Sequence, residues 1–102
     1  MKRGPLSDVA PSDWHRVVLD ERGDEWTSTQ LAERLRVWER SVPGVAFLVG
    51  DADGHHPEDR ARAHELWSLS RLTLPHQLCF VIVAEQLYRA TSIVRGEPYH
   101  RA

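Results

Sequence analysis

Apolar residues recur in short runs separated by charged stretches, and this pattern predicts strands that alternate with helices. The runs at residues 16–19 and 45–49 are valine-containing and of strand length. The polar segment 20–23 reads as a turn-rich loop after the first strand. The glycine-containing segment 50–54 follows the second strand, at the carboxyl edge where open α/β sheets bind ligands. Residues 69–74 alternate and are expected to form a strand or a loop.

Helices are expected between these runs. Thr27 and Gln30 form a capping box, after which apolar residues recur at helical spacing until the Pro-Gly pair at 43–44 ends the helix. The apolar positions of this helix are Leu31, Leu35, Trp38 and Val42. A short charged helix is expected over residues 57–66. Strands alternating with helices predict an α/β fold with a mainly parallel sheet.

The segment 78–93 is apolar on every side of a helical wheel, and Pro75 stands before it, as expected for a helix start. A helix that is apolar all round must be buried, in a core or at a subunit interface. Glu85, Gln86 and Arg89 interrupt the segment, which is also too short to span a bilayer. Its apolar residues are Leu78, Phe80, Val81, Ile82, Val83, Ala84, Leu87, Ala90 and Ile93.

Length and charge limit the remaining possibilities. The chain has 102 residues, enough for one small domain over 14–102 after a polar lead-in over 1–13 that is expected to be flexible. The formal net charge of −2 argues against a general electrostatic grip on RNA, so any RNA contact requires a local patch. Cys79, the only cysteine, is expected to pack as a small apolar residue. The start of the chain lacks the apolar stretch of a signal peptide, which favours a cytoplasmic protein.

The second half of the chain also resembles a known family. It closely resembles the large-subunit ribosomal RNA pseudouridine N3-methyltransferases, which are S-adenosylmethionine-dependent enzymes of the SPOUT superfamily, and the resemblance runs from Arg16 to the end. Members normally carry further residues at the amino end, so this chain is expected to be an amino-truncated member. The matching motifs are Trp67-Ser68-Leu69-Ser70, Leu72-Thr73-Leu74-Pro75-His76, Val83-Ala84-Glu85-Gln86-Leu87-Tyr88-Arg89-Ala90 and Pro98-Tyr99-His100-Arg101.

The resemblance implies a C-terminal trefoil knot, a homodimer formed through the knotted region, and ribosomal RNA or the ribosome as partner. It also implies that three loops bind S-adenosylmethionine, mostly through backbone groups and small side chains. The implied cofactor-binding residues are Leu19, Gly50, Asp51, Gly54, Ser70, Arg71, Leu72, Thr73, Leu74 and Pro75.

The C-terminal tail is the implied catalytic segment. N3 of a uridine-type base carries a proton of high pKa, so a base or a stabilising cation would assist its methylation. His100 would accept or relay the proton, Arg101 would pair with a phosphate or the developing anion, and Tyr99 would orient the base.

Two departures from the family pattern keep a second interpretation open. Asp51 stands where the family usually has a second glycine; its carboxylate would attract the positively charged donor or block the donor's carboxylate end. Ala102 replaces the usual final acidic residue. The alternative is a catalytically impaired knotted dimer that serves as a donor-binding or interaction module.

Other polar residues carry simpler interpretations. Glu85 and Arg89 are one helical turn apart and could form an ion pair, or could bond loop backbone near the cofactor or across the dimer. No zinc site is expected, because the histidines at 55, 56 and 64 lack a recognisable ligand spacing. Asp20 has no evident acid or base partner, and the arginines at 60, 62 and 71 are interpreted as solvated rather than as a basic patch.

Overall fold

The computed structural model describes residues 11–50 and 57–96, and it places one parallel sheet at the centre of the protein. The strands are β1 (His15–Glu25), β2 (Val45–Val49) and β3 (Glu65–Ser68), in the order β2-β1-β3. Both neighbours run parallel to β1. The predicted α/β class and parallel sheet are therefore confirmed.

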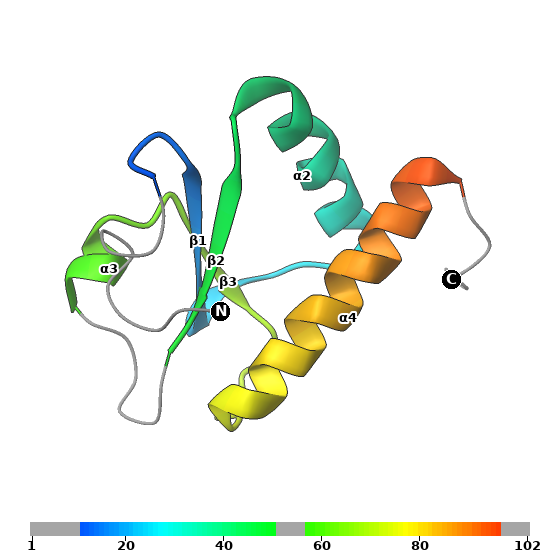
Figure 1. Cartoon of the computed structure of the whole chain (residues 1–102). Coiled ribbons are helices and arrows are strands. Elements are labelled where there is room, and N and C mark those ends of the chain that lie inside the picture. The colour runs from blue at the N-terminus through cyan, green and yellow to red at the C-terminus, as the bar shows by residue number, and fades with distance from the viewer. Residues whose placement is uncertain (1–10, 51–56, 97–102) are drawn as a thin grey trace.

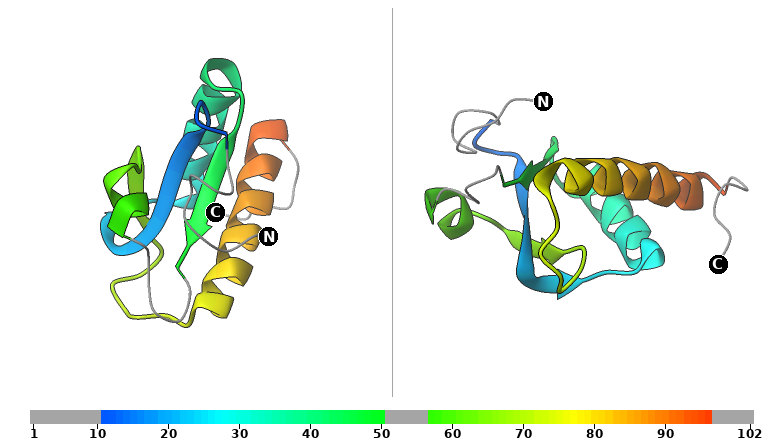
Figure 2. Two further views of the ribbon diagram at one scale, coloured as in Figure 1. Left: turned by 60° about the vertical axis from the view of Figure 1, so that its left-hand side comes forward. Right: turned by 90° about the horizontal axis from the view of Figure 1, so that it is seen from below.

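Helices cover both faces of this sheet. α2 (Ser28–Ser41) and α4 (His76–Arg95) lie on one face, and the short α3 (Pro57–Ala61) lies on the other (Figures 1 and 2). The Ser28 hydroxyl lies 2.6 Å from Oε1 of Gln86 and so links α2 to α4.

The ends of α2 and α4 follow from their sequences. The Thr27 hydroxyl accepts a hydrogen bond from the Gln30 N–H at 3.0 Å, and the Gln30 side chain accepts one from the Thr27 N–H at 2.8 Å, which confirms the capping box. α4 starts directly after Pro75 and ends at Gly96, whose φ of 71° lies in the left-handed region that favours glycine.

The main core lies between the sheet and the pair α2 and α4. Trp67 of β3 is central to it: its ring stacks on Trp26 with centroids 4.8 Å apart and meets Phe47 edge-on at 6.1 Å. A smaller cluster around Val18 and Leu48 packs under α3. The buried residues of the main core are Val17, Leu19, Leu31, Ala32, Trp38, Val49, Trp67, Val83 and Ala90.

Two predicted element boundaries were wrong. β1 does not end at Leu19 but continues to Glu25, because the chain beyond Leu19 pairs again with β3. The charged helix expected over 57–66 ends at Ala61, and Glu65–Ser68 forms β3 instead. Residues 69–74, expected to be a strand or a loop, form a loop that leads into α4.

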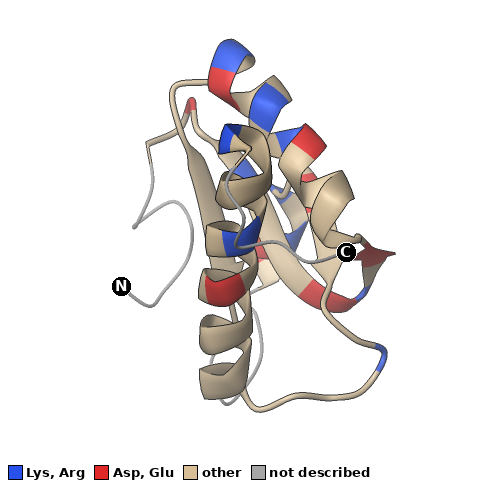
Figure 3. Ribbon diagram, turned by 90° about the vertical axis from the view of Figure 1, so that its right-hand side faces the viewer, with Lys and Arg blue, Asp and Glu red and all other residues tan. Residues whose placement is uncertain are grey.

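The expectation that α4 is buried all round was also wrong for the single chain. Val83 and Ala90 are buried, but Leu78, Val81 and Tyr88 are 45%, 64% and 62% exposed. In Figure 3 the first turns of α4 carry no charge. The outward side of the helix is thus an exposed apolar strip. No helix within the described ranges has the length and hydropathy needed to cross a membrane.

Candidate functional site

A break in the register of β1 shapes the carboxyl edge of the sheet. Leu19 and Asp24 both lie opposite Trp67 of β3, so the four residues between them have no ladder position of their own. We call this segment, residues 20–23, the β1 bulge. Bulges of this kind redirect side chains near functional sites. Here the bulge turns charged side chains toward a cavity.

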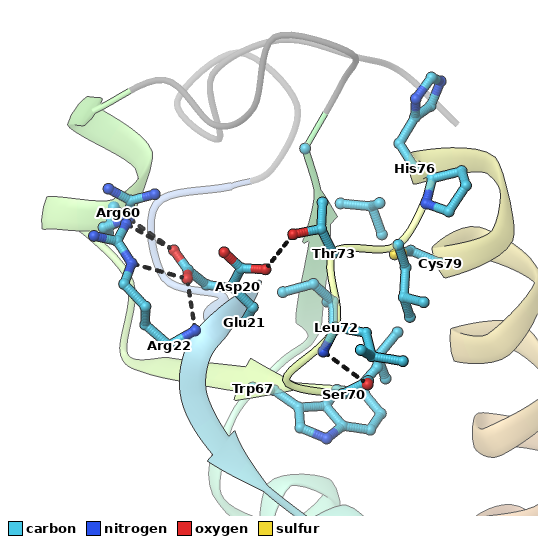
Figure 4. A pocket seen from close by; sticks show the side chains of 16 residues that line it. Asp20, Glu21, Arg22, Arg60, Trp67, Ser70, Leu72, Thr73, His76 and Cys79 are labelled. Carbon is cyan, nitrogen blue, oxygen red and sulfur yellow. Dashed lines mark hydrogen bonds and ion pairs between the residues drawn. The ribbon is translucent and has the colours of Figure 1, made fainter.

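This cavity has a volume of about 630 Å³ and lies at the carboxyl ends of β2 and β3, beside the β1 bulge. The bulge borders one end, and the chain between β3 and α4, residues 69–75, borders the other (Figure 4). The lining residues are Leu19, Asp20, Glu21, Arg22, Val49, Gly50, Arg60, Trp67, Leu69, Ser70, Leu72, Thr73, Leu74, Pro75, His76 and Cys79.

Seven of the ten residues expected to bind the donor line this one cavity. Of the other three, Arg71 lies outside the lining; its side chain is 85% exposed and pairs with Glu25 at 3.3 Å. Asp51 and Gly54 lie outside the described residues, as do Tyr99, His100 and Arg101. The seven lining residues are Leu19, Gly50, Ser70, Leu72, Thr73, Leu74 and Pro75.

Hydrogen bonds at the start of the 69–75 loop, and one from the loop to the β1 bulge, hold this loop in place. The Ser68 hydroxyl donates to the Ser70 carbonyl at 2.9 Å, and the Ser70 hydroxyl accepts from the Leu72 N–H at 3.0 Å. The Thr73 hydroxyl donates to Glu21 at 3.0 Å. The loop is therefore positioned against β1 across the cavity.

At the other end of the cavity, two arginines share the carboxylate of Asp20. Its Oδ1 accepts from the backbone N–H of Arg22 at 2.9 Å and from Arg22 Nε at 3.3 Å. Its Oδ2 accepts from Arg60 Nε at 2.9 Å. Only 4% of the Asp20 side chain is exposed. Burial alone would raise the pKa of Asp20, but hydrogen bonds from Arg22 and the charge of Arg60 outweigh it, so the pKa is lowered from 3.8.

Replacing Asp20 with asparagine should lower the free energy of unfolding at pH 7 by about 1–3 kcal/mol, because its charge-assisted hydrogen bonds are removed. A lowered folded-state pKa means that this contribution is present above pH ~4 and disappears as the pH falls through the folded-state pKa. Urea unfolding of both proteins between pH 7 and pH 3 measures the gap. The same substitution at the exposed Asp24 is the control and should change stability little; a gap for Asp20→Asn that stays constant with pH would contradict the ionic role.

Two further lining residues mark the start of α4. His76 meets the Phe80 ring edge-on at 6.5 Å. Cys79 packs against the main core, as predicted, and burial raises the pKa of its thiol above 9.0. The thiol is therefore protonated at neutral pH.

Sequence reasoning missed the charged lining of the cavity. Arg60 was interpreted as a solvated arginine and Asp20 as a loop residue without a partner, whereas the two form an ion pair across 40 residues of sequence. One signal was present in the sequence: Asp20, Glu21 and Arg22 directly follow the strand predicted over residues 16–19, and ligand-binding side chains gather at the carboxyl ends of strands in parallel sheets.

The remaining polar candidates lie away from the cavity lining. Glu85 and Arg89 form an ion pair on α4 at 3.0 Å. His64 accepts a hydrogen bond from the Arg16 N–H at 2.9 Å. Within residues 11–50 and 57–96, no group of His, Cys, Asp and Glu side chains could hold a metal ion.

Comparison with known proteins gives one family. The family model described as "Predicted SPOUT methyltransferase" matches residues 4–100. A relative from Cupriavidus metallidurans, named ribosomal RNA large subunit methyltransferase H, is 57% identical over 84% of this chain and 54% of its own length. Relatives of the same name from Burkholderia ambifaria and Nitrosospira multiformis are 48% and 50% identical over 99% and 92% of this chain, and over 65% and 60% of their own lengths. The chain thus spans between half and two thirds of these relatives.

Proposed function

Because the chain belongs to the SPOUT methyltransferase family, we propose that it transfers a methyl group from S-adenosylmethionine to large-subunit ribosomal RNA, at N3 of a pseudouridine. The relatives named as methyltransferases of that RNA support the substrate class. The proposed place of action is the cytoplasm, where bacterial ribosomes are.

A single structural observation carries the proposal. Residues from three separated segments, around Leu19, at Gly50 and over 70–75, meet at one cavity. The spacing of these three segments in the sequence does not require them to line one cavity. A donor site shared by all three would require it. Its location at the carboxyl ends of parallel strands is where α/β proteins bind ligands.

The cavity suits S-adenosylmethionine in size and chemistry. Its volume of about 630 Å³ lies in the range of small-molecule sites, roughly 300–1,000 Å³. Apolar side chains of Trp67, Leu69 and Leu74 can cover an adenosine group, and the loop backbone can bond its polar edges. When bound, the donor supplies an activated methyl group. The cavity residues contribute by binding and orientation, which supply much of the rate in a one-step displacement.

Tyr99, His100 and Arg101 are the proposed catalytic residues. His100 would accept or relay the N3 proton, and Arg101 would stabilise the developing anion or pair with a phosphate. Tyr99 would orient the base by stacking. A trefoil knot that brings this tail to the donor cavity belongs to the same proposal.

Calorimetric titration with S-adenosylmethionine and S-adenosylhomocysteine tests the donor site. We expect saturable binding of both, and at least a tenfold loss of affinity for Leu72→Asp, since Leu72 lines the cavity. Leu72 is 72% exposed, so the change should leave the fold intact. The matched control is Val37→Asp on α2, at a residue that is 51% exposed and outside the cavity lining, which should bind as wild type. Absence of binding by the folded wild-type chain would favour the alternative, an impaired dimer that serves as an interaction module.

We also propose that the chain forms a homodimer through the exposed apolar strip of α4. Leu78, Val81 and Tyr88 stand three and seven residues apart and so share one side of the helix. An exposed strip of this kind marks a contact surface. Val81→Glu should convert the dimer to a monomer in sedimentation-velocity runs, whereas Val37→Glu should stay dimeric. A wild-type chain that is monomeric at micromolar concentration would refute the proposal.

A further inference from the structure

At the charged end of the cavity, two arginines share one buried aspartate. Asp20 contributes one negative charge, and Arg22 and Arg60 contribute two positive ones. Arg71 and Arg36, by contrast, each pair with a glutamate, Glu25 and Glu33 respectively. These three residues carry a net charge of +1. Glu21 also lines the cavity and brings its four charged lining residues to zero, but its carboxylate bonds to the Thr73 hydroxyl, so the positive charge is local to the two guanidinium groups.

Among residues 11–50 and 57–96, each guanidinium group keeps N–H donors that bond to no other residue. Asp20 engages Nε of each arginine, and Nη2 of Arg22 lies 3.4 Å from its Oδ2. The Arg22 and Arg60 side chains are 64% and 40% exposed. A guanidinium carries further N–H groups in a planar fork that matches phosphate geometry. The buried Asp20 carboxylate thus holds each arginine through its Nε. The other N–H groups of the two arginines can donate to an anion.

The tertiary fold builds this arrangement from two elements. Arg22 comes from the β1 bulge and Arg60 from α3, and both line the cavity in which the donor is proposed to bind. Because Asp20 is buried and ionised, the arginines need not be ordered when a ligand arrives, which lowers the entropic cost of binding.

We propose that Arg22 and Arg60, positioned by Asp20, bind a phosphate of the substrate RNA next to the donor cavity. This inference rests on the proposed function. The chain carries a net charge of −2, so it requires a local site of this kind to hold a phosphate backbone.

The other anion that could reach these arginines is the carboxylate of the donor. Glu21 argues against it. In Figure 4 the Glu21 carboxylate lies between Asp20 and Thr73, and it bonds to the Thr73 hydroxyl of the 69–75 loop. A donor held by that loop would have to pass its own carboxylate over Glu21 to reach the arginines, and like charges repel.

The double variant Arg22→Gln/Arg60→Gln tests the inference with the whole chain and purified large ribosomal subunits. We expect ribosome affinity to fall about 10- to 100-fold, and the slope of log K against log salt to fall by about 0.7–0.9 for each phosphate that is no longer neutralised. Affinity for S-adenosylmethionine, measured by calorimetry, should change less than about twofold. The control Arg36→Gln/Arg40→Gln removes the same charge from α2, at two arginines that lie outside the cavity lining.

Three results would overturn the inference, and they are distinguishable. If both double variants bind subunits equally, the effect is one of net charge only. If Arg22→Gln/Arg60→Gln loses S-adenosylmethionine affinity but keeps its affinity for 5′-methylthioadenosine, which lacks the carboxylate, the arginines bind the donor instead. If the wild-type chain binds neither donor nor subunits, the proposed function itself fails, and the inference with it.

Discussion

Gly23→Val should separate β1 from β3 and lower the free energy of unfolding by about 3 kcal/mol or more. A Cβ at residue 23 would overlap the backbone carbonyl of Leu66 and lie 2.7 Å from the Trp67 nitrogen. Backbone atoms in a paired strand cannot move aside as a side-chain tip can. A domain of this size is stable by only about 5–15 kcal/mol, so the change is a large fraction of the total. Chemical denaturation monitored by tryptophan fluorescence measures it.

The matched control is Gly96→Ala. Gly96 has a φ of 71°, but a Cβ there would meet nothing within 4 Å. The substitution should lower the free energy of unfolding by only about 1 kcal/mol, the cost of placing alanine in the left-handed backbone conformation. If the two variants were equally destabilised, glycine at residue 23 would not be needed for the close approach of β1 and β3 at the bulge.

His100→Ala should lower the rate of methyl transfer by about 10²–10⁴, the usual contribution of a general acid or base. The measured quantity is transfer of labelled methyl from S-adenosylmethionine to large ribosomal subunits isolated from cells that lack the modification. Donor affinity should remain near that of the wild type, because His100 is proposed to act on the base and not to bind the donor.

A readout beyond rate distinguishes catalysis from misfolding. The kcat of the wild type should rise with pH through the pKa of the essential base, and His100→Ala should lose that dependence. A variant with the wild-type profile and a uniformly lower rate would instead indicate that residue 100 only orients the tail.

The parts of the fold that could be predicted from sequence are those fixed by local chemistry. The start of α2 depends on a capping box within three residues, and its end on Pro43 and Gly44. β2 is a five-residue apolar run between turn signals. For these elements, neighbouring residues contain the information.

β3 and the β1 bulge could not be predicted because distant partners stabilise them. In the sequence, the start of residues 65–68 reads as the end of a charged helix. In the structure these residues form a strand because they pair with β1. Likewise, the polar residues 20–23 resemble a turn because the second pairing of β1 with Trp67 is invisible in the sequence. Tertiary pairing overrides local propensity in both cases.

The candidate site also contains residues that could be predicted from the sequence and residues that could not. Leu19, Gly50 and the lining residues of segment 70–75 could be named in advance, since the family resemblance marks them. The ion pairs of Asp20 could not, because Arg60 reaches it from an element 40 residues away. Nor could periodicity show which side of α4 stays exposed, because every side is apolar.

The place of β1 in the sheet has a consequence during synthesis. Of the three described strands it is the central one, yet it is synthesised before both of its neighbours. At elongation rates of roughly 5–20 residues per second, β3 is complete about 2–9 seconds after β1. Parallel strands cannot close as hairpins, so every rung of this sheet needs a long-range contact, a topology that folds slowly. Until then both edges of β1 lack these partners, and its apolar run at residues 17–19 is open to association with other chains. We therefore expect the yield of folded protein to depend on translation speed and chaperone supply more than its small size suggests.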